Sequence, residues 1–113
     1  MKTTEIENGF YISCYRNESL ENESHEKEVS KEFIQFHFCQ KGEGVFQFNE
    51  GSYSFPVQGK NVIVLYNPMK ALPINLNLHP DSSMVSLVIS IKKFHSLFSE
   101  DSDEIHFLNS ENN

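Results

Sequence analysis

The chain has 113 residues, 38% of them hydrophobic, which is enough for a single domain with one core. Its 16 acidic and 9 basic residues give a formal net charge of −7. A surface of that sign repels phosphate backbones, so we do not expect the chain to bind nucleic acid on its own. The first residues lack a signal-peptide pattern, and no apolar run approaches the ~20 residues that cross a bilayer. We expect a soluble, cytoplasmic protein with no membrane partner.

Short apolar or alternating runs, separated by turn residues every 8 to 12 positions, predict about seven β-strands and an all-β fold. The expected strands span residues 10–15, 33–40, 45–49, 52–57, 61–66, 74–79 and 84–91. The Glu-rich segment 16–32 has no sustained apolar stripe and is expected to be an exposed loop. The continuous apolar run 61–66 predicts a strand buried on both faces. Apolar spacing predicts a short helix over 92–99.

Four glycines mark tight turns in the segment FHFCQKGEGVFQFNEGSYSFPVQGKNVIVLYNP, residues 36–68: Gly42, Gly44, Gly51 and Gly59. The order strand, G-x-G turn, strand, Asn-Glu-Gly turn, strand, glycine turn and Asn-Pro-terminated strand resembles a cupin barrel. This resemblance implies a small antiparallel β-barrel of the double-stranded β-helix or jelly-roll type, with a short C-terminal helix.

A narrower resemblance covers residues 10–105. The stretches LYNPMKALPINLNL and LVISIKKFHSLF are similar to the N-terminal sensor domain of AraC-type bacterial transcription regulators. The resemblance implies one effector-binding and dimerisation domain over 1–113, with an ordered core of about 9–106. It also implies a small-molecule effector such as a sugar or another metabolite, and a homodimer in the full-length protein. DNA binding is expected only through a C-terminal helix-turn-helix domain that this chain lacks.

The ligands of metal-binding cupins are not matched here. The segment before residue 33 has no H-x-H, Gln35 stands about where a carboxylate ligand is expected, and 66–72 contains no histidine. An amide without imidazoles is a poor ligand for iron, manganese or zinc. Cys14 and Cys39 are expected to be reduced thiols, and the histidine and cysteine spacing fits no zinc site. We therefore expect no metal, no cofactor and no enzymatic activity.

The candidate ligand-binding residues come from strand alternation. Gln35, His37 and Cys39 share one face of their strand, opposite Ile34, Phe36 and Phe38. The cupin resemblance implies that the polar face lines the barrel lumen. There His37 and Gln35 could contact an effector, with walls supplied by Tyr53, Phe55 and Tyr66.

Purely structural roles also stay open for these residues. His37 could be a hydrogen-bonded barrel residue, or it could be exposed if the strand faces the other way, and the three aromatics could be simple core packing. Phe94, Leu97 and Phe98 on the predicted helix are candidates for packing against the barrel or a partner.

Two other functions remain open at this point. One is a stand-alone, metal-free cupin enzyme, such as a sugar epimerase or isomerase. The other is a structural module whose barrel is fully packed and which only dimerises.

Overall fold

The computed structural model describes residues 2–48 and 51–99, which form nine strands and one helix. The elements are β1 (Lys2–Glu7), β2 (Phe10–Asn17), β3 (Glu23–Lys27), β4 (Phe33–Lys41), β5 (Glu43–Phe48), β6 (Tyr53–Gln58), β7 (Val62–Leu65), β8 (Ile74–Leu78), β9 (Ser82–Ser90) and α1 (Ile91–Ser99). No helix in this part of the chain is long and apolar enough to cross a membrane.

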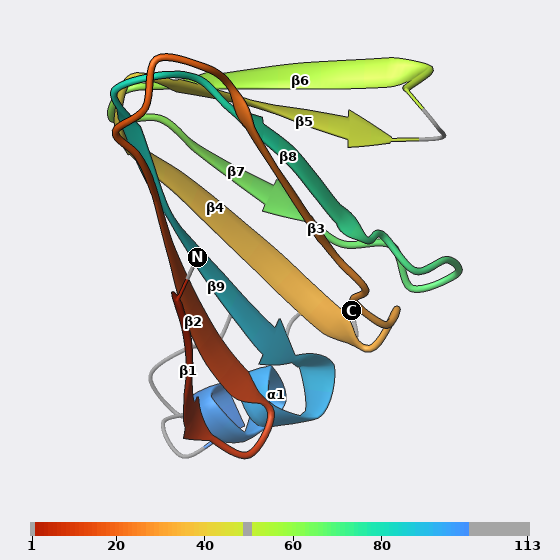
Figure 1. Ribbon diagram of the computed structural model, residues 1–113. Helices are drawn as coiled ribbons and strands as arrows, with labels where there is room; N and C mark the ends of the chain where they lie inside the picture. The colour runs from red at the N-terminus through yellow and green to blue at the C-terminus, as the bar shows by residue number, and fades with distance from the viewer. Residues whose placement is uncertain (1, 49–50, 100–113) are drawn as a thin grey trace.

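Two sheets face each other (Figure 1). Sheet A has the strand order β1-β2-β9-β4-β7, and sheet B has the order β3-β8-β5-β6. The paired strands are antiparallel. The centre of sheet A is β9, which pairs with β2 on one side and with β4 on the other. The all-β prediction with a short C-terminal helix is confirmed.

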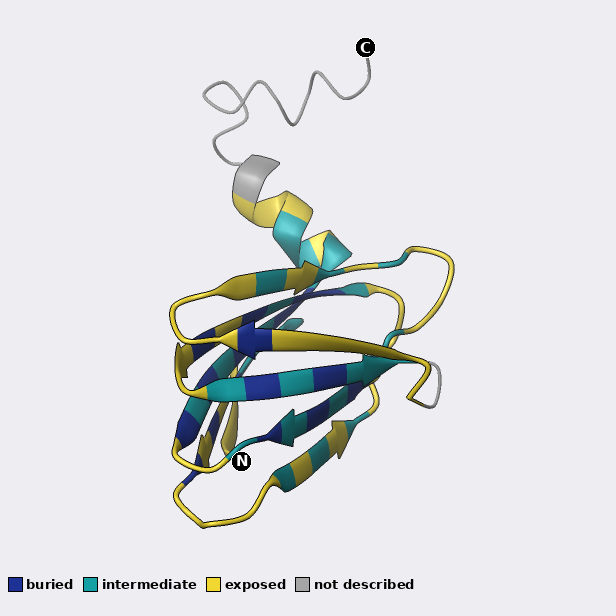
Figure 2. Cartoon of the chain, turned by 90° about the horizontal axis from the view of Figure 1, so that it is seen from above, coloured by how far each residue is buried: buried dark blue, intermediate teal, exposed yellow. Residues whose placement is uncertain are grey.

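The core lies between the sheets, where buried residues alternate with less buried ones along the central strands (Figure 2). Sheet B contributes mainly apolar side chains, among them Phe46, Leu76 and Leu78, none of which is exposed to solvent. Sheet A contributes a mixed set that includes buried polar residues. Alternation in the sequence produces this arrangement because successive side chains of a strand point to opposite faces.

The turn between β4 and β5 requires a glycine. Gly42 has a φ of +75°, which residues with a Cβ rarely adopt. A Cβ here would also overlap the Ser82 side chain and approach the Asp81 carbonyl oxygen to 2.9 Å. Ser82 occupies that space because its hydroxyl accepts a hydrogen bond from the Glu43 amide at 2.9 Å. The turn therefore fixes the start of β5 against the start of β9.

Three predictions about the strands were wrong. β1 was not predicted, because all of its residues are exposed and its backbone pairs with β2 alone among the described strands. β3 lies inside the segment expected to be a loop, and its charged sequence is typical of an edge strand protected against further pairing. β7 is an edge strand with Val62 and Val64 exposed, so it is not buried on both faces.

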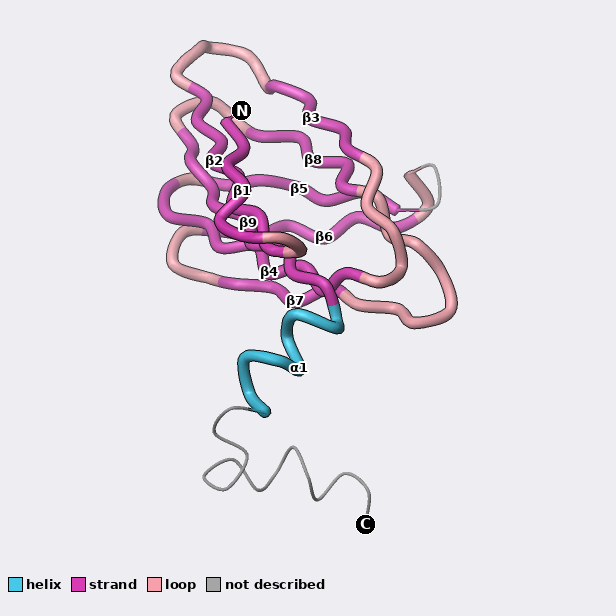
Figure 3. The backbone as a smooth tube through the Cα atoms, turned by 90° about the horizontal axis from the view of Figure 1, so that it is seen from below, coloured by secondary structure: helices cyan, strands magenta, loops and turns pink. Residues whose placement is uncertain are grey.

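The predicted helix is confirmed as α1, which continues directly from β9 and projects away from the sheets (Figure 3). Ser90 caps it, since the Ser90 hydroxyl accepts a hydrogen bond from the Lys93 amide at 2.9 Å. Of the candidate interface residues, Phe94 is half-buried and Leu97 is 41% exposed. The side chain of Phe98 and the predicted end of the core at 106 lie outside the described part of the chain.

Candidate functional site

A row of polar side chains crosses the interior of sheet A. Register places Ser13 on β2 beside Ser86 on β9, and Ser86 beside His37 on β4. All three are buried, with exposures of 1% or less. His37 therefore faces the lumen, as the cupin resemblance implied, and the alternative of an exposed His37 is wrong.

Hydrogen bonds define the state of His37. Gln35 Nε2 donates to the Leu72 carbonyl oxygen at 2.5 Å, which turns Gln35 Oε1 toward His37 Nε2 at 2.8 Å. Because an amide oxygen only accepts, His37 carries its proton on Nε2. His37 Nδ1 then accepts from the Ser86 hydroxyl at 2.5 Å. Both ring nitrogens are thus satisfied within the protein.

Burial lowers the pKa of His37 to about 4 from its ordinary 6.5. The cause is desolvation, because the charged imidazolium has no water around it. The ring packs against Phe46 from sheet B, with the ring centroids 4.4 Å apart. His37 is consequently neutral at pH 7 and sealed within the core.

Tyr15 extends the polar interior toward β2. Burial raises the pKa of Tyr15, while the neighbouring hydroxyls of Ser86 and Ser13 act in the opposite direction. The Tyr15 hydroxyl is buried and makes no hydrogen bond of good geometry with the described residues. Its ring meets His25 of β3 edge to face, with centroids 5.2 Å apart. Buried polar side chains of sheet A thus lie beside the apolar core.

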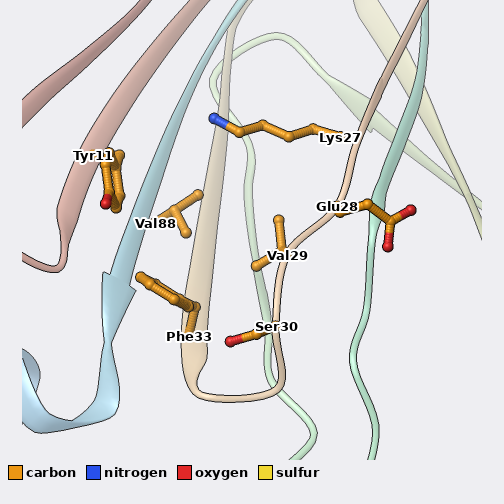
Figure 4. Close-up of a pocket in the computed structure, with 7 residues that line it drawn as sticks. All are labelled: Tyr11, Lys27, Glu28, Val29, Ser30, Phe33 and Val88. Atoms are coloured by element: carbon orange, nitrogen blue, oxygen red, sulfur yellow. The ribbon is translucent and has the colours of Figure 1, made fainter.

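Next to this row lies an open pocket of about 320 Å³, between sheet A and the segment that joins β3 to β4 (Figure 4). Its lining residues are Tyr11, Lys27, Glu28, Val29, Ser30, Phe33 and Val88. Val88 pairs with Tyr11 on one side and with Gln35 on the other, so the pocket floor adjoins the polar row. A concave, mostly apolar surface with a few polar groups is the usual form of a small-molecule site.

The structure does not bring all the predicted ligand residues together. Gln35 and His37 are hydrogen-bonded to each other and buried, and Gln35 pairs with the pocket residue Val88, but neither lines the pocket. Tyr53 and Phe55 are 59% and 51% exposed on β6, and Tyr66 is 41% exposed after β7. The three aromatic side chains therefore do not form enclosed walls of the lumen.

Sequence reasoning missed the residues that do line the pocket. Phe33 has the same strand parity as Gln35 and His37, so the alternation that placed those two inward also places Phe33 inward. Tyr11 lies in the first predicted strand, but its partner Val88 is set by pairing across 77 residues of chain. Lys27 lies in the segment expected to be an exposed loop, and nothing in its surroundings in the sequence marks it. No group of three or more His, Cys, Asp or Glu side chains gathers among the described residues.

Solved structures similar to this one include cupins. An RmlC-like cupin protein from Desulfovibrio desulfuricans aligns with a TM-score of 0.58 and 16% identity over 78% of each chain. The cupin domain of Cnp3 from Schizosaccharomyces pombe aligns at 0.55 and 10% identity, over 82% of this chain and 61% of that one. Ectoine synthase from P. lautus aligns at 0.50 and 17% identity, over 73% and 54%. No protein-family model and no curated protein sequence matches the chain.

These likenesses establish the fold alone, because all of them are below 25% identity. The chain has a cupin-like, double-stranded β-helix fold, which confirms the barrel that the glycine-punctuated segment predicted. The neighbours include an enzyme, ectoine synthase, and proteins whose names state no activity, so they do not assign an activity.

Proposed function

We propose that this cupin domain is the effector-sensing and dimerisation module of an AraC-type transcription regulator, and that it is not an enzyme. In this proposal DNA binding belongs to a helix-turn-helix domain outside the chain. The observation that carries the sensing role is the open pocket lined by Tyr11, Lys27, Phe33 and Val88. A buried, neutral His37 with both nitrogens engaged supports binding over catalysis.

The pocket is connected to α1 through short hydrogen bonds. The Ile91 amide donates to the Glu32 carbonyl at 2.8 Å, and Glu32 directly precedes the pocket residue Phe33. The Ser90 amide donates to the Gly9 carbonyl at 2.8 Å, close to Tyr11. A ligand that shifts these residues shifts the start of α1, which is how occupancy would reach a neighbouring domain.

Dimerisation is supported by the outer face of sheet A. Register aligns two cross-strand rows there, Ile12-Leu87-Phe36-Val64 and Cys14-Val85-Phe38-Val62. The four strands have 8, 9, 9 and 4 residues. At ~4.8 Å between strands and ~3.3 Å per residue they cover roughly 480 Å², more than half of the ~800 Å² that each partner contributes to a standard interface. A second copy can cover such a face by two-fold symmetry. Sedimentation of the chain as a monomer at all concentrations would contradict this part.

The sensing role is tested by blocking the pocket at its rim. Ser30 is exposed there, so Ser30→Trp fills the opening without overpacking the core. We expect that a metabolite screen finds a compound that raises the melting temperature of the wild-type chain, and that Ser30→Trp abolishes this rise. The matched control is Ser24→Trp, on the exposed outer side of β3, which should leave it intact. Equal responses of both variants would contradict the pocket assignment.

The regulator assignment has its own test in the gene. Two helix-turn-helix motifs encoded beyond Asn113 would support it, and a stop codon at that point would contradict it.

A further inference from the structure

We infer that the pocket binds a small monocarboxylate with a flat, apolar body. This inference rests on the proposed function, because it names the class of effector that the sensing pocket takes. It also replaces the sugar expected from the family resemblance, since a sugar presents many hydroxyls and needs many polar partners.

The first observation is an uncompensated cation. Lys27 is half-buried, and the ion pairs in the described part of the chain leave its ammonium without a carboxylate. Its side chain extends across the pocket toward Tyr11 and Val88, whereas the carboxylate of Glu28 points away (Figure 4). In a protein with a net charge of −7, this inward positive charge selects an anion.

The second observation is the aromatic wall. The rings of Tyr11 and Phe33 lie 6.1 Å apart at an interplanar angle of 50°, and Lys27 Nζ stands 5.9 Å from the Tyr11 ring centroid. Val29 and Val88 are both 6% exposed and close the remaining sides. These surfaces accept a flat apolar group beneath the ammonium rather than a second charge.

Size and hydrogen bonding narrow the class further. A volume of about 320 Å³ holds roughly ten water molecules at ~30 Å³ each, so a ligand of about ten non-hydrogen atoms fits. The Ser30 hydroxyl, which faces Phe33 in Figure 4, accepts a hydrogen bond from the Glu32 amide at 3.2 Å. Its own proton is then available to a second carboxylate oxygen. Benzoate has the charge, flatness and size that these residues require.

The experiment is calorimetric titration of the folded chain with benzoate, and with benzamide as its neutral counterpart. We expect benzoate to bind and benzamide to bind at least about tenfold more weakly, since a charge-assisted hydrogen bond is lost. Lys27→Gln should weaken benzoate to the level of benzamide. Lys31→Gln is the matched control, because Lys31 is exposed and outside this pocket, and it should leave benzoate binding unchanged.

Three outcomes would overturn the inference: no heat from benzoate at millimolar concentration, equal binding of benzamide, or equal losses in Lys27→Gln and Lys31→Gln. The ligand class and the sensing function fail separately. If neutral compounds bind in a manner that Ser30→Trp blocks, the sensing pocket stands and only the carboxylate assignment falls. If nothing binds in a manner that Ser30→Trp blocks, both fall.

Discussion

The two faces of sheet A partly invert the usual distribution of residues, because the inner face buries a polar row beside apolar side chains such as Met84 and Val88. Its inner face buries Ser13, Ser86, His37 and Gln35, whereas its outer face presents Phe36, Phe38, Val62 and Val64. Three of those outer side chains are 38% to 57% exposed. A half-buried sheet ordinarily places its apolar side inward. This arrangement indicates that each face is suited to a role besides the stability of the isolated chain: the inner face to the adjoining pocket, and the outer face to contact with another surface.

The inner face can be polar because its groups satisfy one another. The path from Ser86 through His37 and Gln35 to the Leu72 carbonyl joins β9, β4 and the segment before β8 without water. Such a network holds its members in one arrangement and so fixes the floor of the adjoining pocket. The outer face differs, because its exposed apolar side chains are removed from water only when another surface covers them.

The largest expected effect concerns the inner face, where protonation of His37 at low pH should lower the free energy of unfolding. His37 has a pKa of about 4 when folded against 6.5 when unfolded, so the unfolded chain binds the extra proton between these values. The stability contribution is therefore fully present above pH 6.5 and is lost as the pH falls to 4. We expect urea unfolding at pH 4.5 to show about 2 to 3 kcal/mol less free energy from this group than at pH 7.5.

The control for this prediction is His37→Gln, which cannot titrate in that range. The His37→Gln variant should be less stable than the wild type at pH 7.5. Between pH 7.5 and 4.5, however, its free energy of unfolding should fall by about 2 to 3 kcal/mol less than that of the wild type. Parallel pH profiles of the two proteins would show that His37 is already charged, or accessible to water, in the folded chain.

The second prediction tests whether the outer face of sheet A forms the dimer interface. Phe38→Asp places a charge at the centre of the row Cys14-Val85-Phe38-Val62 and should weaken homodimerisation by about tenfold or more. Ser54→Asp is the control, because Ser54 is exposed on the outer face of sheet B. Sedimentation at several concentrations measures both. An unchanged association constant in Phe38→Asp would remove the outer face of sheet A from the interface.

The sequence predicts the fold well because strand alternation and turn glycines act locally. The alternation in FIQFHFCQ sets His37 and Gln35 apart from Phe36 and Phe38, and the structure confirms that separation. Only the topology shows which side is inside, since the polar side is buried here and hydrophobicity alone would choose the other. The cupin resemblance supplied the direction that hydrophobicity could not.

The pocket could not be predicted in the same way. Tyr11 and Val88 meet through the pairing of β2 with β9, and Lys27 reaches them only because β3 pairs with β8 in the opposite sheet. β3 itself has a charged sequence that resembles a solvated loop, because an edge strand is held by backbone hydrogen bonds more than by buried side chains. Long-range pairing of a polar strand leaves little signal in local patterns.

The smallest effect compares the two cysteines, one on each face. Cys14 is exposed in the outer apolar row, whereas Cys39 is buried and its thiol lies 3.3 Å from the Gly42 carbonyl oxygen. Burial raises the pKa of Cys39, which lowers its thiolate fraction further. With a thiol reagent in excess, we expect rapid labelling of Cys14 and labelling of Cys39 only on unfolding.

If a second copy covers the outer face, Cys14 labelling should slow several-fold as protein concentration rises, and it should stay fast in Phe38→Asp. Labelling of Cys14 that is independent of concentration in both proteins would mean that this row stays uncovered, and the inversion of sheet A would then need another partner.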